Sequence, residues 1–323
     1  MRPPAHWHVR QRRRPSVAFS IVAGCSLAFL TVITWILWPS GGAKTAEPLA
    51  SGSSVVECAG GGLCVSTGIA YAGAAAPPAV RGASAVVSEE PCGAELYTKY
   101  GDARHPPASL TKLATALVAI ERADLDEQVL IDVNSALLVA SSGSTVMGLE
   151  PGETLSMRDL LYGLLLPSGN DAAIAIAEDV GGTVPSFVDL MNLKGRELGL
   201  GDTHFANPHG LDEPGLYTSA RDLIVLGRAV LADPELATMV RSQHYQPSWD
   251  GPEVWNSNEL IGLYQGQVTG VKIGYTEGAG QTMVASVERD GRRLIVSVLG
   301  TWDRYADTIS LFEWAFANTR PAC

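Results

Sequence analysis

Three short motifs in the chain carry residue types that together can perform acyl transfer. The first is Ser109-Leu110-Thr111-Lys112. Prolines just upstream disfavour helix, so we expect a helix to begin at or near Ser109. Three residues along a helix place Ser109 and Lys112 on one face, within hydrogen-bonding distance. A serine hydroxyl needs an adjacent base to act as a nucleophile. Lys112 can be that base only if burial or positive neighbours lower its pKa.

The second motif is Pro167-Ser168-Gly169-Asn170-Asp171, at a break between two apolar helical stretches. Polar side chains at such a break can project into a cleft. Ser168 can relay a proton to a leaving amine, and Asn170 can hydrogen-bond a substrate amide. The alternative is a helix-capping loop in which Asn170 or Asp171 is the N-cap.

The third motif is Lys272-Ile273-Gly274-Tyr275-Thr276, near the end of an apolar strand-like run. Lys272 can bind a substrate carboxylate and, as a positive neighbour, keep the pKa of the base low. Gly274 lets a ligand approach the backbone closely. The alternative is a lysine on an edge strand, where its charge discourages aggregation.

Each motif alone is a weak signal, because each also occurs for ordinary structural reasons. Their order and spacing are more specific. Ser168 follows Ser109 by 59 residues, and Lys272 follows Ser168 by 104 residues. The first motif lies at a predicted helix start, the second in a helical region and the third on a late strand.

The elements that must position these motifs are strands at both ends of the chain with helices between them. Leu113, Leu117 and Ile120 recur at helical spacing, and Ser156 with Asp159 predicts a helix start. The predicted strands cover residues 83–88, 95–100, 267–273, 281–288 and 293–299, and a final helix covers 303–318. This order predicts an α+β fold in which both chain ends build one sheet beside a helical lobe. The cleft between sheet edge and lobe is the natural ligand site.

Charge is distributed unevenly along the 323 residues. The net charge is −11, yet five arginines precede the first acidic residue, Glu47. Without those five, the remainder has 18 basic and 34 acidic residues, a net charge of −16. A body this acidic repels phosphate backbones, which excludes a nucleic-acid partner.

The N-terminal region predicts a membrane anchor. Residues 17–38 form an uncharged run long enough to cross roughly 30 Å of hydrocarbon. Arginines on one side and tryptophans at the other end follow the positive-inside pattern. We therefore expect a cytoplasmic basic tail over 1–16, a transmembrane anchor over 17–38, a flexible linker over 39–80 and an extracytoplasmic domain over 81–323. A cleaved signal peptide ending near Gly41-Gly42-Ala43 and a lipid attachment at Cys25 are the alternatives.

Four cysteines lie outside the predicted anchor, at positions 58, 64, 92 and 323. An even number beyond the cytoplasm permits disulfides, and four cysteines allow three pairings between which the sequence does not choose. A bond between Cys58 and Cys64 closes the shortest loop, and free thiols are the alternative.

The set Ser-x-x-Lys, Ser-x-Asn and Lys-x-Gly resembles that of the penicillin-binding proteins and β-lactamases. From about residue 77 to 318 the chain resembles the low-molecular-mass D-alanyl-D-alanine carboxypeptidases, peptidase family S11. Residues 104–112, 203–212, 217–223 and 256–258 are similar to stretches of that family. Ser-Gly-Asn at the second motif favours it over the lactamases. Ile273 departs from the family, which has a threonine there that helps to bind the substrate's terminal carboxylate.

The resemblance implies a β-lactamase/transpeptidase-like fold and a serine D,D-carboxypeptidase that acts on peptidoglycan stem peptides. It implies β-lactams as covalent inhibitors, no cofactor or metal, and an oxyanion site formed by backbone N–H groups. Some members carry a C-terminal amphipathic tail, which we expect the N-terminal helix to replace as anchor. The implied site consists of Ser109, Lys112 and Ser168 in catalysis, and Asn170, Lys272, Gly274, Tyr275 and Thr276 in substrate binding.

Two other functions fit the same residues. A D,D-endopeptidase that cuts cross-links acts on a bond whose carboxylate is not terminal, which agrees with Ile273. A catalytically weak sensor of wall peptides or β-lactams is the hypothesis from another class. A class A β-lactamase is disfavoured because no Glu-x-x-Leu-Asn stretch is present to place a deacylating water. The histidines at 204 and 209 are interpreted as structuring a loop.

Overall fold

The computed structural model describes residues 65–67, 74–249, 251–264 and 267–323. The chain divides into two compact units, Met1–Ser51 and Gly52–Cys323, and every described residue belongs to the second. The predicted tail and anchor, over residues 1–38, lie outside the described residues. Within the described ranges, no helix combines the length and apolar character needed to span a bilayer.

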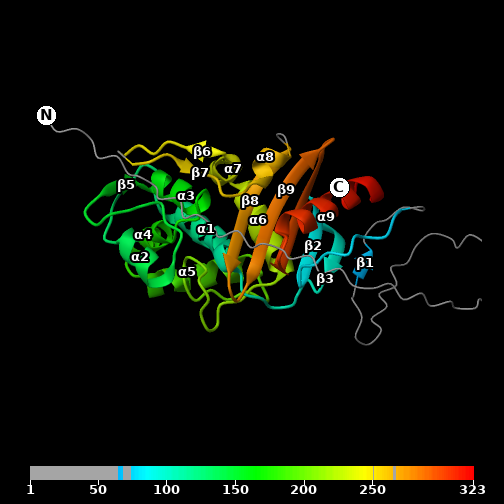
Figure 1. Ribbon diagram of the computed structural model, residues 1–323, viewed down its shortest axis with the longest axis horizontal. Coiled ribbons are helices and arrows are strands. Elements are labelled where there is room, and N and C mark those ends of the chain that lie inside the picture. The colour runs from blue at the N-terminus through cyan, green and yellow to red at the C-terminus, as the bar shows by residue number, and fades with distance from the viewer. Residues whose placement is uncertain (1–64, 68–73, 250, 265–266) are drawn as a thin grey trace, which may run out of the picture. The chain divides into compact units, whose positions relative to one another are not determined.

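A six-stranded sheet joins the two ends of the described chain, in the order β1-β3-β2-β10-β9-β8 (Figure 1). Every pairing in it is antiparallel. The strands are β1 (Val65–Thr67), β2 (Ser84–Glu90), β3 (Ala94–Lys99), β8 (Val268–Thr276), β9 (Gly280–Arg289) and β10 (Arg292–Thr301). Because β10 pairs with β2, the predicted union of both chain ends in one sheet is confirmed.

Helices surround this sheet and build the adjoining lobe. They are α1 (Lys112–Arg122), α2 (Ser135–Ser142), α3 (Met157–Leu165), α4 (Asn170–Gly181), α5 (Val184–Glu197), α6 (Ala220–Ala232), α7 (Pro234–Arg241), α8 (Leu260–Leu263) and α9 (Arg304–Asn318). Two small strand pairs accompany them: β4 (Gln128–Leu130) with β5 (Thr154–Ser156), and β6 (His244–Tyr245) with β7 (Val254–Trp255). The α+β prediction is confirmed.

Two apolar clusters cover the two faces of the sheet. Val86, Val284 and Ile295 belong to the cluster shared with the helical lobe. Their neighbours along each strand face the other way, toward the cluster that contains Leu311 and Phe312 of α9. Figure 1 shows α9 lying across the sheet on the side opposite α6. The central strand β2 is buried along its whole length, as expected of a strand covered on both faces.

Local signals explain where several elements begin and end. Ser156 caps α3 by accepting a hydrogen bond from the Asp159 N–H, as predicted. Asp290 and Gly291 both have positive φ, which fits the predicted tight hairpin between β9 and β10. Of the region predicted as a flexible linker, residues 65–67 and 74–80 are described, and the first of these stretches is a short strand, β1, which pairs with β3.

One disulfide joins described cysteines, Cys92 to Cys323. It fastens the segment after α9 to the turn between β2 and β3. The sequence did not choose among three pairings, and the partners turn out to be 231 residues apart. Cys58 and Cys64 lie outside the described residues, so a bond between them stays a prediction.

Candidate active site

Ser109 lies in a tight turn packed against the end of the sheet. It belongs to a 3-10 turn, Ala108–Thr111, and the α-helix begins only at Lys112, so the predicted helix start was early. Ala108 has a positive φ of 51°. A Cβ on Gly210 would lie 1.9 Å from the Ala108 carbonyl oxygen, so only glycine lets this loop cover the turn. The predicted proximity of Ser109 and Lys112 is nevertheless present.

Lys112 is fully buried and meets three oxygen acceptors. Its Nζ lies 3.1 Å from Ser109 Oγ, 2.7 Å from Asn170 Oδ1 and 2.7 Å from the His209 carbonyl oxygen. Burial, with a smaller effect from the charge of Lys272, holds its pKa well below the ordinary value of 10.5. The charge of Asp171 opposes that shift. A buried lysine of lowered pKa beside a serine hydroxyl has the geometry of a nucleophile and its base.

Asn170 is the first residue of α4 and is turned into the site. The N-cap is Gly169, so the alternative in which Asn170 or Asp171 caps the helix is wrong. The Asn170 amide nitrogen donates to Ser144 Oγ at 2.9 Å, while its oxygen accepts from Lys112. Ser144 therefore fixes which end of the amide faces the lysine.

Asp171 is a buried carboxylate that the sequence motifs did not single out as a site residue. It accepts hydrogen bonds from the backbone N–H groups of Met147, Gly148 and Leu149, and from the Ser135 hydroxyl at 2.6 Å. These bonds fasten the segment that carries Ser144 to the start of α4. No sequence signal pointed to this role because the donors are mostly backbone groups 22–36 residues away.

Ser168 precedes α4 with a positive φ of 70°, a conformation that non-glycine residues rarely adopt. Its side chain is buried, and its hydroxyl has no hydrogen-bond partner among the described residues. A buried hydroxyl without a partner is costly in a purely structural role. The arrangement leaves this hydroxyl available to a bound substrate.

Lys272 on β8 is a second buried lysine in this region. Burial, aided by the charge of Arg304, lowers its pKa to about 7. Arg304, the first residue of α9, donates to the Gly274 carbonyl oxygen at 2.8 Å and is itself mostly buried. The sequence did not identify Arg304, because α9 meets β8 only through the folded sheet. The two cations form a positive site next to the serine turn.

Gly274 lies directly against the nucleophile turn. A Cβ at this position would come within 2.8 Å of the Ser109 backbone nitrogen and 2.5 Å of Thr282 Oγ1. β8 is an edge strand in the described sheet, so alternate N–H groups point away from β9. Tyr275 follows with its side chain 63% exposed. Two backbone segments thus approach each other where an oxyanion can be bound.

The side chains of Ile273 and Thr276 both contact other parts of the protein. Ile273 packs against the apolar cluster that contains α9. The Thr276 hydroxyl donates to Asp212 Oδ1 at 2.7 Å and accepts from the Ala279 N–H at 3.0 Å. To bind a substrate carboxylate, that hydroxyl would have to give up Asp212. The Lys272–Arg304 pair is the stronger candidate for this task.

The two loop histidines have structural contacts, in line with their interpretation. His204 Nδ1 lies 2.8 Å from the Gly215 carbonyl oxygen. His209 Nδ1 accepts from the Leu211 N–H, and burial together with the Lys112 charge lowers the pKa of His209 to about 4. No group of three metal-ligating side chains occurs in the part of the chain that is described.

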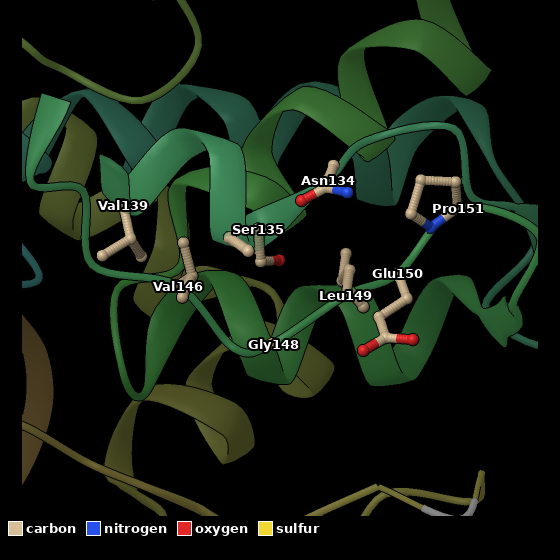
Figure 2. Close-up of a pocket in the computed structure, with 9 residues that line it drawn as sticks. Asn134, Ser135, Val139, Val146, Gly148, Leu149, Glu150 and Pro151 are labelled. Carbon is tan, nitrogen blue, oxygen red and sulfur yellow. The ribbon is translucent and has the colours of Figure 1, made fainter. Parts of the chain in front are cut away.

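A separate hollow of about 510 Å³ opens beside α2. Figure 2 shows the segment from Val146 to Pro151 running alongside this helix. None of the predicted site residues lines the hollow. Ser135 lines the hollow and also donates a hydrogen bond to Asp171, so the hollow adjoins the segment that Asp171 holds in place.

The chain matches a protein-family model described as D-alanyl-D-alanine carboxypeptidase over residues 71–302. The D-alanyl-D-alanine carboxypeptidase DacF of Bacillus subtilis is 36% identical over 242 residues, which are 73% of this chain and 62% of that protein. DacB2 of Mycobacterium tuberculosis is 36% identical, covering 72% of this chain and 81% of that protein.

Solved structures give the same likeness. The crystal structure of a D-alanyl-D-alanine carboxypeptidase from Mycobacterium tuberculosis has a TM-score of 0.70 and 33% identity, covering 78% of this chain and 96% of that one. The Streptomyces K15 DD-transpeptidase has a TM-score of 0.71 and 30% identity, covering 75% and 100%. The chain spans somewhat less than two thirds of the length of several curated relatives, 62% for DacF and 64% for DacD of Salmonella typhimurium.

Proposed function

Since the chain belongs to the D-alanyl-D-alanine carboxypeptidase family, we propose that it is a serine D,D-carboxypeptidase of peptidoglycan stem peptides. The observation that carries this proposal is the 3.1 Å contact between Lys112 Nζ and Ser109 Oγ inside a buried site that holds the pKa of Lys112 well below its ordinary value. Neutral Lys112 takes the hydroxyl proton as Ser109 Oγ attacks the carbonyl carbon between the two terminal D-alanines.

The surrounding groups fit the later steps. Backbone N–H groups of Ser109 and Tyr275 stabilise the tetrahedral oxyanion. The C–N bond then breaks, and the proton that Lys112 took from Ser109 reaches the departing D-alanine amine through the Ser168 hydroxyl. Asn170 orients the peptide, and Lys272 with Arg304 binds the terminal carboxylate. Water releases the acyl group and restores the Ser109 hydroxyl. A β-lactam enters by the same attack and remains as a stable acyl-enzyme.

We also propose where in the cell the enzyme acts. Residues 17–38 anchor the chain in the cell membrane as a single span, and the domain from residue 81 lies outside the cytoplasm. The arginines before the span and the tryptophans at its end support this orientation. The substrate is extracytoplasmic, which agrees with it.

A D,D-endopeptidase is the second candidate function, favoured by one observation. Ile273 has no hydroxyl, and the Thr276 hydroxyl is bonded to Asp212. Neither side chain is therefore free to bind a terminal carboxylate through a hydroxyl. In a cross-link the remaining D-alanine is joined to the side-chain amine of a neighbouring stem peptide, so no terminal D-alanine carboxylate follows the scissile bond and less of this recognition is needed.

The test uses the full chain in detergent with a labelled penicillin. Wild type should form a covalent adduct on Ser109 that is absent from Ser109→Ala and retained in Ser141→Ala, an exposed serine on α2. Absence of an adduct in wild type would overturn the assignment. A stem tripeptide ending in D-Ala-D-Ala and purified cross-linked muropeptide then separate the activities. D-Alanine release from the tripeptide supports the carboxypeptidase, cleavage of the cross-link alone supports the endopeptidase, and an adduct without turnover of either supports the sensor.

A further inference from the structure

A second hollow lies near the proposed catalytic site, between the β6–β7 hairpin and α8. Its volume is about 370 Å³, and its lining includes Gln243, Trp255, Asn258, Glu259 and Leu263. None of the predicted catalytic or binding residues lines it. The acyl-transfer mechanism makes no use of these side chains.

The apolar part of the lining is an exposed aromatic ring. Trp255 is 61% exposed, and its cross-strand neighbour His244 holds the ring from one side at a centroid distance of 5.0 Å. Leu263 is 60% exposed on the same hollow. Large apolar side chains gathered at one place on a surface mark a binding site more often than scattered ones do.

The polar part of the lining has unused hydrogen-bonding groups. The side chains of Gln243 and Glu259 make no hydrogen bond to any other described residue. Asn258 is 3% exposed, and its amide oxygen accepts from the Leu260 N–H at 3.2 Å. Its amide nitrogen has no partner within the described part of the chain. An aromatic ring surrounded by a few amide and carboxylate groups is typical of a specific small-ligand site.

These groups fit a neutral, N-acetylated sugar. The C–H face of a pyranose ring is apolar and stacks on an aromatic face, whose negative potential attracts the C–H groups. Sugar hydroxyls donate to a carboxylate such as Glu259, and an acetamide pairs with amides such as Gln243. A phosphate-bearing ligand is disfavoured because Glu259 would repel it.

The hollow is linked closely to the catalytic cleft. Ser257, two residues after Trp255, donates from its N–H and its hydroxyl to the Leu166 carbonyl oxygen, each at 3.0 Å. Leu166 lies two residues before Ser168. Adding these chain lengths places Trp255 within roughly 20 Å of Ser168, while an extended five-residue stem peptide spans roughly 17 Å. This upper limit is of the same order as the length of one stem peptide, so the two sites are near enough to receive parts of one substrate.

We propose that this hollow is a glycan subsite that binds an N-acetylated sugar of the strand to which the stem peptide is attached. The inference rests on the proposed function, since it assigns a second part of the same substrate. Binding the sugar beside the cleft raises the local concentration of the stem peptide at Ser109.

The test compares the kcat/KM of D-alanine release from a free pentapeptide and from the same pentapeptide on its GlcNAc–MurNAc disaccharide. Wild type should prefer the disaccharide form by about tenfold, which corresponds to about 1.4 kcal/mol. Trp255→Ala should reduce this preference to about one. Trp302→Ala is the matched control, because Trp302 is 70% exposed but does not line the hollow, and it should keep the preference.

A wild-type preference near one, or a preference that survives in Trp255→Ala, would contradict the subsite. Loss of kcat/KM by the same factor on both substrates would assign the hollow to peptide rather than to sugar, which also contradicts it. If neither substrate releases D-alanine, the proposed function fails and the subsite is tested by calorimetry. The disaccharide alone should then bind Ser109→Ala, and at least tenfold more weakly when Trp255→Ala is added.

Discussion

At the scale of single residues, the site holds two lysines in an environment that penalises their charge. Lys112 is fully buried, and Lys272 is 1% exposed. Burial is the largest cause of the lowered pKa of each, and each also has a cationic neighbour. Buried lysines of this kind cost stability, because protonating them in the folded chain lowers the free energy of unfolding.

Lys272→Met should therefore stabilise the protein below pH 7. In the unfolded chain Lys272 titrates near 10.5, and in the folded chain near 7. The unfolded state binds more protons between these values, so wild-type stability rises with pH across that window. The gain from Lys272→Met should be on the order of 5 kcal/mol at most below pH 7 and vanish near pH 10.5. Urea unfolding measured from pH 6 to 10 checks this.

Lys194→Met is the matched control for that experiment. Burial opposes the charge of Lys194, but Glu121 and Glu197 outweigh burial and raise its pKa. Its removal should bring no gain in the free energy of unfolding near pH 7. A Lys272→Met variant that is no more stable than wild type at pH 6 would contradict a charge cost at this position.

The contact between Ser109 and Lys112, the proposed catalytic pair, was predictable from sequence, whereas the contacts that support it were not. Ser109 and Lys112 are three residues apart, so local geometry brings them together. The partners of Asp171 and Arg304 come from distant segments, and no short motif encodes such contacts. The direction of the Thr276 hydroxyl was unpredictable for the same reason, because its partner Asp212 is 64 residues away.

At the scale of elements, a single side chain, that of Asp171, holds the segment between α2 and β5 in place. Asp171 at the start of α4 receives the Met147, Gly148 and Leu149 N–H groups. Ser144, three residues earlier, then reaches Asn170. Contacts thus run from the Asp171 carboxylate through this loop to the Asn170 amide, which faces the proposed catalytic lysine, Lys112.

Asp171→Asn should weaken both the fold and acylation. An amide replaces one carboxylate oxygen by a donor, so buried N–H groups lose their acceptor, at about 2–4 kcal/mol. Release of Ser144 from Asn170 should slow penicillin acylation by about tenfold or more. The free energy of unfolding and the rate of adduct formation measure the two effects.

Two further variants separate positioning from folding. Asp189→Asn, on the exposed side of α5, should change neither quantity. Ser144→Ala removes one buried hydrogen bond, so it should cost about 1–3 kcal/mol, less than Asp171→Asn, and it should shift the pH dependence of acylation because Asn170 is then free to turn its amide. Wild-type acylation by Asp171→Asn would overturn the positioning role.

Element boundaries were predictable where a local signal fixes them. Ser156 marked the start of α3, and the Val- and Ile-rich runs marked β8, β9 and β10 to within a few residues. The 3-10 turn at Ser109 was missed because contacts with Gly210 and Gly274 shape it. The strand β1 was missed because its only signal is pairing with β3.

At the scale of the whole molecule, the disulfide closes the described sheet and α9 into one covalent loop. Cys92 and Cys323 are 231 residues apart, and restraining so long a loop in the unfolded chain stabilises the folded one. Cys92→Ser with Cys323→Ser should cost about 2–5 kcal/mol, or roughly 5–15 °C in Tm. Thermal unfolding with and without a reductant checks this. Reductant should lower the Tm of wild type more than that of the double variant, and equal shifts would contradict the prediction.

The pairing of β2 with β10 also sets the order in which a new chain can become active. Val87 pairs with Val296, which the ribosome adds 209 residues later. At about 5–20 residues per second, β2 waits roughly 10–40 seconds for its neighbour. For most of that interval Ser109 has been synthesised but Lys272 has not, and Arg304 is added only after Val296. A nascent chain therefore carries Ser109, the proposed nucleophile, before its site is complete, and we expect reactivity toward penicillin to begin only when the last strands have joined the sheet.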